Sequence, residues 1–266
     1  MKSPSHNYNK YFSQNTIWDT QEKDIYYIKK KNLILTILPS DIKYVLDVGC
    51  GNGSITKEIL SDNRSVVGVD INDIPFKDVN FHAVKASATD LPFGDLSFDC
   101  CMSHELLEHL NKDEIKSAIA EMQRVSKKYL LVSVPHQENL LLFNTKCNKC
   151  NTVFNIWGHK VKFSEKRLLK MFGKFQLLGS YKFGEILPKY NEVLLKIKQV
   201  LGRSFFVPSP EEAILCPACG NNNFVKTYQH TFNKVVCRMC DFLNYKIIHG
   251  HKKKAPYWIM LLLERE

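Results

Sequence analysis

Short apolar runs alternate with helical stretches through the middle of the chain. The first run, Tyr44 to Val48, breaks into glycines at Gly49, Gly51 and Gly53 and then resumes at helical spacing. Four further runs of strand length follow, at residues 65–70, 79–84, 98–103 and 129–135, with helical stretches between the later ones. Strands that alternate with helices predict an α/β fold built on a parallel, doubly wound sheet.

The first two strands carry candidate ligand-binding groups at their carboxyl ends, where ligands bind in such sheets. The glycine turn lets backbone amides approach a ligand closely, and Asp70, at the end of the second strand, can accept hydrogen bonds from ribose hydroxyls. The turn reads G-x-G-x-G and lacks the G-x-G-x-x-G spacing of dinucleotide sites. Together these features predict a nucleoside-bearing ligand without a pyrophosphate.

Four stretches in series resemble the motifs of class I S-adenosylmethionine-dependent methyltransferases. They are VLDVGCGNGSIT, GVDIN, DLPFGDLSFD and CMSHELLEHL, and the resemblance covers roughly residues 40–183. It implies a Rossmann-like seven-stranded sheet, methyl transfer as the activity and S-adenosylmethionine as the cofactor, which is a nucleoside without a diphosphate. By the same resemblance, APYWIMLLLERE is the seventh strand of that sheet.

The resemblance also implies which residues hold the cofactor. Asp47 and the turn would hold the methionine end, Asp70 the ribose and Ile71 the adenine, while Ser87 stands where relatives often have an acid that contacts the adenine amino group. The strand end at His104 would lie beside the reactive methyl group, as a polar wall or through its backbone. The full expected set is Asp47, Gly49, Cys50, Gly51, Asp70, Ile71, Ser87, Ala88 and His104.

The stretch ELLEHL places Glu105, Glu108 and His109 at i, i+3 and i+4, which predicts one face of a helix. Two carboxylates and an imidazole there could bind a divalent metal. The alternatives are local packing of the histidine, or a general-base role for His109 or for His136, which follows the fifth strand.

Six of the nine cysteines form three C-x2-C pairs. Two pairs, separated by a spacer of strand-like character, predict a zinc ribbon with the ligands Cys216, Cys219, Cys237 and Cys240. The third pair, Cys147 and Cys150, predicts a second zinc site, with His159 and His136 as the nearest further ligands. Two buried thiols, or one shared arrangement of all three pairs, remain alternatives. Two structural zinc ions per chain are therefore expected.

These signals predict a small insertion in the methyltransferase sheet. We expect an N-terminal helical cap at 1–39, the methyltransferase core at 40–184, an inserted helix and zinc ribbon at 185–252, and the final strand of the core at 253–266. The insertion would stiffen a cap on the substrate side.

Charge is distributed unevenly along the chain. Residues 1–135 hold 16 Lys and Arg against 18 Asp and Glu, so the net charge of +10 comes from residues 136–266. A basic surface attracts phosphate-bearing or acidic partners, although a merely solvated basic face is the alternative. The sequence starts without a secretory signal and contains no apolar run of bilayer length, and we expect a cytoplasmic protein with reduced cysteines.

Three functions are compatible with the sequence. The first is a methyltransferase that acts on a small-molecule or glycan-like acceptor, such as a cell-surface polysaccharide or a lipid-linked sugar; relatives with a cysteine knuckle followed by F-x-x-x-GH look most like this group. The second is a nucleic-acid methyltransferase that uses the ribbon and HGHKKK as a basic surface. The third is a non-catalytic scaffold with the methyltransferase fold. The sequence does not predict the oligomeric state.

Overall fold

A computed structural model describes residues 25–61, 63–72, 80–187, 189–209, 212, 214–224, 230–249 and 256–266. The chain divides into two compact units. Of the described residues, 25–137, 161–185 and 256–266 form the sheet unit, and 138–160 and 186–249 form the cysteine unit. Residues 138–160, which the sequence assigned to the core, therefore belong with the inserted segment. Most of the expected N-terminal cap, and residues 250–254 of the basic HGHKKK stretch, lie outside the described residues.

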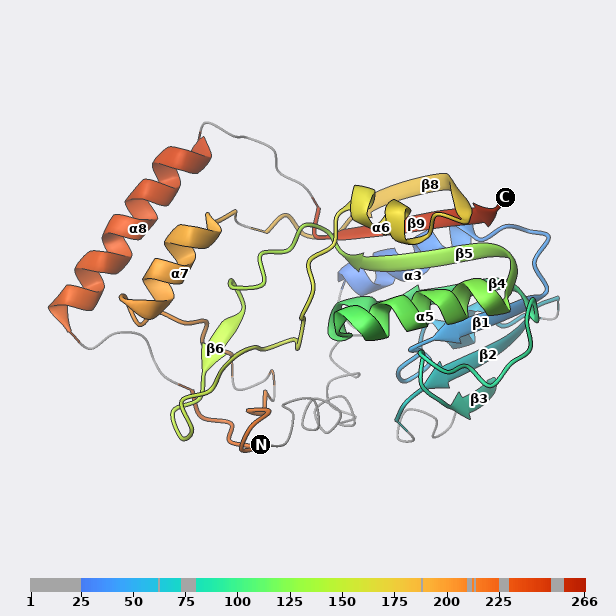
Figure 1. The fold of residues 1–266 in the computed structure, drawn as a ribbon, viewed down its shortest axis with the longest axis horizontal. Helices are drawn as coiled ribbons and strands as arrows, with labels where there is room; N and C mark the ends of the chain where they lie inside the picture. Colours follow the sequence, from blue (N-terminus) through green and yellow to red (C-terminus); the bar gives the residue numbers. More distant parts are fainter. Residues whose placement is uncertain are drawn as a thin grey trace. The chain divides into compact units, whose positions relative to one another are not determined.

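The sheet unit contains one seven-stranded sheet with the order β3-β2-β1-β4-β5-β9-β8 (Figure 1). Strands β1 to β5 pair in parallel, and β9 is antiparallel to both of its neighbours. The predicted doubly wound sheet is confirmed, and so is the strand predicted near residue 260, which lies between β5 and β8. The strands are β1 Tyr44–Val48, β2 Ser65–Asp70, β3 His82–Lys85, β4 Phe98–His104, β5 Ser126–Pro135, β8 Phe175–Phe183 and β9 Trp258–Arg265.

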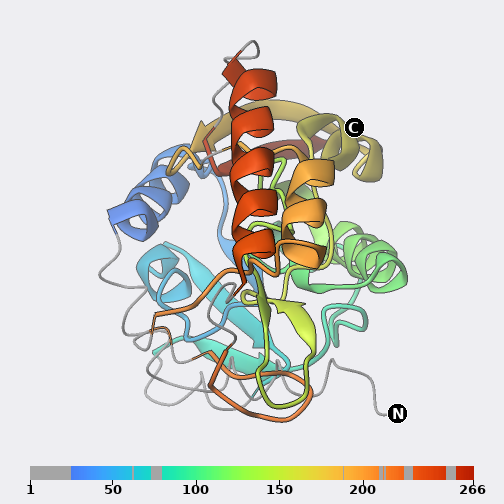
Figure 2. The ribbon, with the colours of Figure 1, turned by 90° about the vertical axis from the view of Figure 1, so that its left-hand side faces the viewer.

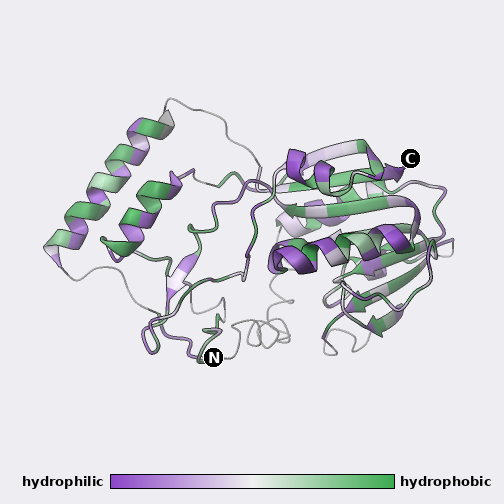
Figure 3. Ribbon diagram, in the orientation of Figure 1, coloured by the Kyte–Doolittle hydropathy of each residue, from purple (hydrophilic) through white to green (hydrophobic). Residues whose placement is uncertain are grey.

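Helices cover both faces of this sheet and bury its central strands. Helices α5 (Lys112–Val125) and α6 (Glu165–Met171) pack on one face, and α3 (Ile25–Ile37) and α4 (Thr56–Ile59) on the other. Strands covered on both sides should be apolar along their length, and the central strands are mostly hydrophobic (Figure 3). Helix α5 begins with a capping box between Asn111 and Glu114, which directs the chain back along the sheet.

The cysteine unit contains a short hairpin and two helices. Strands β6 (Asn144–Lys146) and β7 (Val153–Asn155) pair antiparallel, and helices α7 (Glu192–Val200) and α8 (Thr231–His249) lie side by side (Figure 2). Asp241 of α8 accepts hydrogen bonds from Tyr190 and Lys198 at 2.8 and 2.7 Å. The strand-like character predicted for the end of the ribbon spacer is therefore wrong, because residues 231–236 begin α8.

Among the described residues, no helix has both the length and the apolar character that crossing a membrane requires.

Candidate functional site

The glycine turn forms where β1 ends. Gly49, Gly51 and Gly53 have φ values of 77°, 56° and 74°, a region that glycine enters without steric cost. The amides of Gly49 and Cys50 donate to the carbonyl of Val69 at 2.7 and 3.0 Å, which ties the turn to β2. A Cβ at Gly49 would lie 3.1 Å from Leu106. The turn is therefore tight and has little room for side chains.

Two acids flank this turn. Asp47 is buried and accepts a hydrogen bond from Thr56 at 2.6 Å, while Asp70 accepts from the amides of Gly51 and Asn72 at 3.1 and 2.9 Å. Burial raises the pKa of Asp47 to about 7, against the opposing hydrogen bond from Thr56 and with a further upward contribution from Asp70. Burial also raises the pKa of Asp70. Hydrogen-bond donors or a positive charge on a ligand would stabilise the ionised form of both carboxyl groups.

The other residues expected at the cofactor site lie near these strand ends in different environments. Ile71 is 54% exposed directly after β2, where a flat ring could rest on it. The hydroxyl of Ser87 contacts that of Thr89 at 2.8 Å, and Ala88 packs against the core. Burial raises the pKa of the Cys50 thiol, which packs over Gly68 and is not placed to react as a thiolate. The role of each remains a prediction.

A buried polar network lies beside the turn, at the ends of β4 and β5. His104 and Ser133 are register partners on the two parallel strands, and His104 Nδ1 lies 3.0 Å from Ser133 Oγ. Ser133 Oγ in turn donates to Glu105 Oε1 at 3.3 Å. The hydroxyl of Ser103 donates to the carbonyl of Val48 at 3.0 Å and so joins the end of β4 to the turn.

Glu105 is the centre of this network. It has a φ of 54°, an uncommon conformation for a residue with a side chain, and its carboxylate also contacts Lys30 Nζ at 3.3 Å and accepts from Trp258 Nε1 at 2.6 Å. The sequence did not predict a role for Lys30, Ser133 or Trp258. They come from α3, β5 and β9, and no local pattern links them.

The predicted helix face of Glu105, Glu108 and His109 is wrong. Glu105 lies before the short 3-10 helix Leu107–His109, with its carboxylate on Lys30, Ser133 and Trp258. The positive φ at Glu105 breaks the helical path, so the i, i+3, i+4 geometry does not form. His136 follows β5, where its amide donates to the carbonyl of Tyr257 at 2.6 Å. The suggested base roles of His109 and His136 stay predictions.

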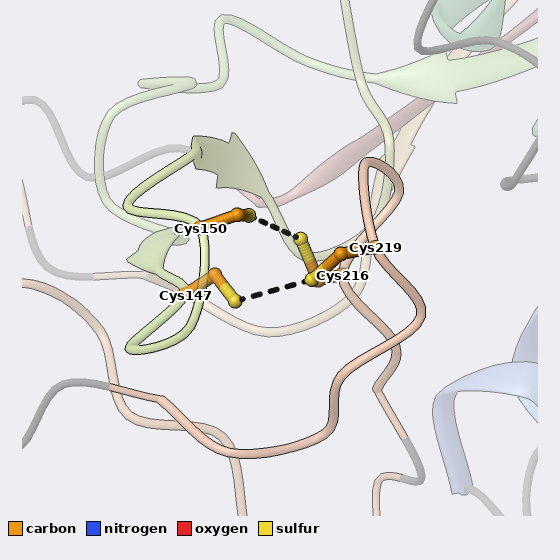
Figure 4. Close-up of side chains that lie close together, drawn as sticks. All are labelled: Cys147, Cys150, Cys216 and Cys219. Atoms are coloured by element: carbon orange, nitrogen blue, oxygen red, sulfur yellow. Dashed lines mark hydrogen bonds between the residues drawn. The ribbon is translucent and has the colours of Figure 1, made fainter.

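Four cysteines of the cysteine unit converge (Figure 4). Cys147 Sγ lies 3.7 Å from Cys219 Sγ, and Cys150 Sγ lies 3.5 Å from Cys216 Sγ. All four sulfur atoms lie within 4.8 Å of one another. Four thiolates at the corners of a tetrahedron around zinc, each about 2.3 Å from the ion, would be about 3.8 Å apart. The cluster fits such an ion.

The two C-x2-C pairs of this four-cysteine cluster have the same backbone turn. The amide of Asn151 donates to the carbonyl of Cys147 at 3.1 Å, and that of Gly220 to the carbonyl of Cys216 at 2.8 Å. Asn151 and Gly220 have φ values of 62° and 70°. Asn and Gly are the residue types that adopt this conformation most readily. An isolated bridge between Cys147 and Phe224 then holds the two turns against each other.

The predicted composition of the two metal sites is corrected by this geometry. Cys237 and Cys240 lie in α8, where both are buried and Cys237 Sγ contacts the carbonyl of Gly202 at 3.6 Å. Cys147 and Cys150 are completed by Cys216 and Cys219, whereas His159 Nδ1 bonds to Glu138 Oε2 at 2.7 Å. Among the described residues, the cysteines form one four-thiol group rather than two sites.

Comparison with known proteins agrees with this fold. A family model described as "Methyltransferase domain" matches residues 46–130. The chain is 31% identical over 111 residues to O-methyltransferase cnsE of Penicillium expansum, covering 36% of this chain and 40% of that protein. The chain spans about half or less of the length of the curated relatives it matches.

Two solved structures show the same fold at low sequence identity. N-methyltransferase NodS of Bradyrhizobium japonicum WM9, in complex with S-adenosyl-l-homocysteine, has a TM-score of 0.53 at 13% identity over 69% of this chain and 92% of its own. The 1,6-didemethyltoxoflavin-N1-methyltransferase of Burkholderia thailandensis has a TM-score of 0.52 at 13% identity over 100% and 91%. Residues 46–130 thus match a methyltransferase domain, and the sheet unit has the fold of these two methyltransferases.

Proposed function

We propose that the protein is an S-adenosylmethionine-dependent methyltransferase with a small-molecule or glycan-like acceptor. The observation that carries this proposal is the pair of acids at the glycine turn. Asp70 has an ordered carboxylate beside exposed Ile71, and Asp47 is a buried acid that a positive charge would stabilise. Asp70 would hold the ribose hydroxyls, and Asp47 with the turn amides would hold the methionine end. The bound cofactor supplies an activated methyl group on a sulfonium.

Helix α3 supports a small acceptor. Its Tyr27 hydroxyl is hydrogen bonded to Ser54, directly after the glycine turn, and one helical turn later Lys30 contacts Glu105 at the end of β4. Lys31 also pairs with Glu58 of α4 at 3.2 Å. One helix thus covers both the turn and the adjacent strand end, which favours a small molecule or a protruding sugar over a large flat surface.

Binding of S-adenosylmethionine to an Asp70→Ala variant tests the cofactor site. We expect at least a 100-fold weaker affinity by calorimetry, because two ribose hydroxyls lose a charged hydrogen-bond acceptor, each worth about 1.5 to 3 kcal/mol. Asp95→Ala is the matched control, since that carboxylate has a 75% exposed side chain and pairs with Arg124. Equal affinity for the Asp70 variant and the parent would refute the proposed site.

We also propose that Cys147, Cys150, Cys216 and Cys219 hold one structural zinc ion. The ion would have four protein ligands and no open position, which is typical of structural rather than catalytic zinc. Asn221 supports the ligands through a hydrogen bond from Nδ2 to Cys147 Sγ at 3.5 Å. We expect one zinc ion per purified chain by atomic emission; two ions would favour the separate sites predicted from the sequence.

A further inference from the structure

The hydrogen bonds around Ser133 determine which nitrogen of His104 carries a proton. Ser133 Oγ has one proton and two partners, Glu105 Oε1 at 3.3 Å and His104 Nδ1 at 3.0 Å. A carboxylate can only accept, so the serine proton points to Glu105. His104 Nδ1 must then carry a hydrogen and donate it to Ser133, which leaves His104 Nε2 as a bare lone pair.

That lone pair has no hydrogen-bond partner among the described residues, although His104 Nε2 is buried and the residue is only 8% exposed. A buried acceptor without a partner loses its hydrogen bonds to water and gains none in return, and such groups call for a functional explanation. The positive φ at Glu105 is a second sign, because strained backbone gathers at functional sites.

We propose that His104 is a catalytic residue whose Nε2 accepts the proton of a hydroxyl group on the methyl acceptor, and that Ser133 and Glu105 are positioning residues that fix its tautomer. This inference rests on the proposed methyltransferase function and specifies its acceptor as an alcohol or phenol. Lys30 completes the arrangement, since its ammonium lies 3.3 Å from the Glu105 carboxylate and holds that carboxylate in place.

In the proposed step, methyl transfer is accompanied by loss of the acceptor's hydroxyl proton. The acceptor oxygen forms a bond to the methyl carbon, the bond from that carbon to sulfur breaks, and the sulfur keeps the electron pair as S-adenosylhomocysteine. The acceptor's O–H proton moves to His104 Nε2, and the imidazolium later releases it to solvent. Ser133 and Glu105 exchange no proton in this step; they hold the ring and stabilise its developing charge, as in other acid-oriented histidines.

The electrostatics of the network favour an oxygen acceptor over an amine. Burial, with a further contribution from the charge of Lys30, lowers the pKa of His104 to about 3, so the ring is neutral before the reaction. A ring of that basicity still takes a proton from a protonated ether, which is a far stronger acid, but not from a methylated ammonium. Lys30 also repels an ammonium group. A carboxylate acceptor has no proton to give.

The tautomer can be read directly by long-range 1H–15N NMR of histidine-labelled protein saturated with S-adenosylhomocysteine. His104→Asn identifies the signal. We expect Nδ1 with the shift of a protonated nitrogen and Nε2 with that of an unprotonated one, and we expect Ser133→Ala to lose this preference. Ser126→Ala is the matched control, because Ser126 is a buried serine of β5 that donates to the carbonyl of Tyr129.

Adding phenol and, separately, benzylamine to the same sample tests the acceptor class. A change of the Nε2 shift with phenol alone supports the proposal. A proton on Nε2, an unchanged tautomer in Ser133→Ala, or no response to phenol would overturn it. Binding of S-adenosylhomocysteine is measured on the same sample by calorimetry, so failure of the cofactor site is seen separately from failure of the His104 assignment.

Discussion

At the scale of single residues, burial opposes ionisation of the Asp47 carboxyl group. Its pKa is raised from 3.8 to about 7, so the folded state holds a proton that the unfolded state has lost above pH 4. Stability of the ligand-free protein should therefore fall as pH rises from about 4 through about 7. The positive charges of bound S-adenosylmethionine would favour the ionised acid.

Asp47→Asn should remove this pH dependence. Asparagine can still accept the hydrogen bond from Thr56, so we expect the variant to be more stable than the parent by about 2 to 4 kcal/mol at pH 8 and about equal at pH 4, because each unit of pKa shift corresponds to about 1.4 kcal/mol. Urea unfolding at the two pH values measures the difference, and cofactor affinity should fall. An equal gain in stability at pH 4 and pH 8 would show that ionisation is not the cause.

The sequence predicted the positions of only some residues of the candidate site. The glycine turn and Asp70 are close in sequence to the strands that carry them, so their spacing was sufficient. Lys30 could not be predicted, because its partners Glu105 and Trp258 are brought to it by two other elements of the sheet unit. Glu105 was noticed but misassigned, since helical spacing does not reveal a residue with positive φ.

At the scale of elements, the C-x2-C spacing had two interpretations. In a turn this spacing can present two thiols to a metal, as we propose for Cys216 and Cys219. In a helix it places both residues on one face. Cys237 and Cys240 follow the second pattern, and both are buried in α8. The apolar residues before Cys237 stand three and four positions apart, at Phe232, Val235 and Val236, which fits the helix period; the strand-like interpretation rested on residue type rather than on spacing.

Gly184 follows β8 directly and lies against the ring of Trp258. It has a φ of 94°, and a Cβ there would overlap the ring of Trp258, whose indole donates to Glu105. We expect Gly184→Ala to destabilise the protein by about 1 to 3 kcal/mol and to shift the His104 resonances by displacing Trp258. Gly94→Ala is the control in urea unfolding, since its new Cβ would come no closer than 3.4 Å to Ser97. Similar losses for both variants would contradict the predicted overlap.

At the scale of the whole molecule, the four-thiol cluster joins segments that are 66 residues apart, from Cys150 to Cys216. Metal loss should therefore remove the long-range restraint of the cysteine unit. We expect the double variant Cys216→Ser, Cys219→Ser to lose the zinc ion and to melt in a separate, earlier transition, because structural zinc commonly contributes about 10 kcal/mol or more.

The double variant Cys237→Ala, Cys240→Ala is the matched control for that experiment. It should keep one zinc ion per chain and lose only packing within α8 and at Gly202. Calorimetry with zinc analysis distinguishes the two variants. Retained zinc in the Cys216 and Cys219 variant would rule out the proposed ligand set.

The order of the sheet has a consequence for synthesis on the ribosome. Strand β9 lies between β5 and β8 but follows the cysteine unit in the chain. Until β9 has been translated, the nascent chain exposes the unpaired backbone groups along β5 and β8, which are the features that recruit unwanted partners. The sheet that holds the glycine turn can therefore close only after the four clustered cysteines have been made, so capture of the proposed zinc ion can precede completion of the methyltransferase fold.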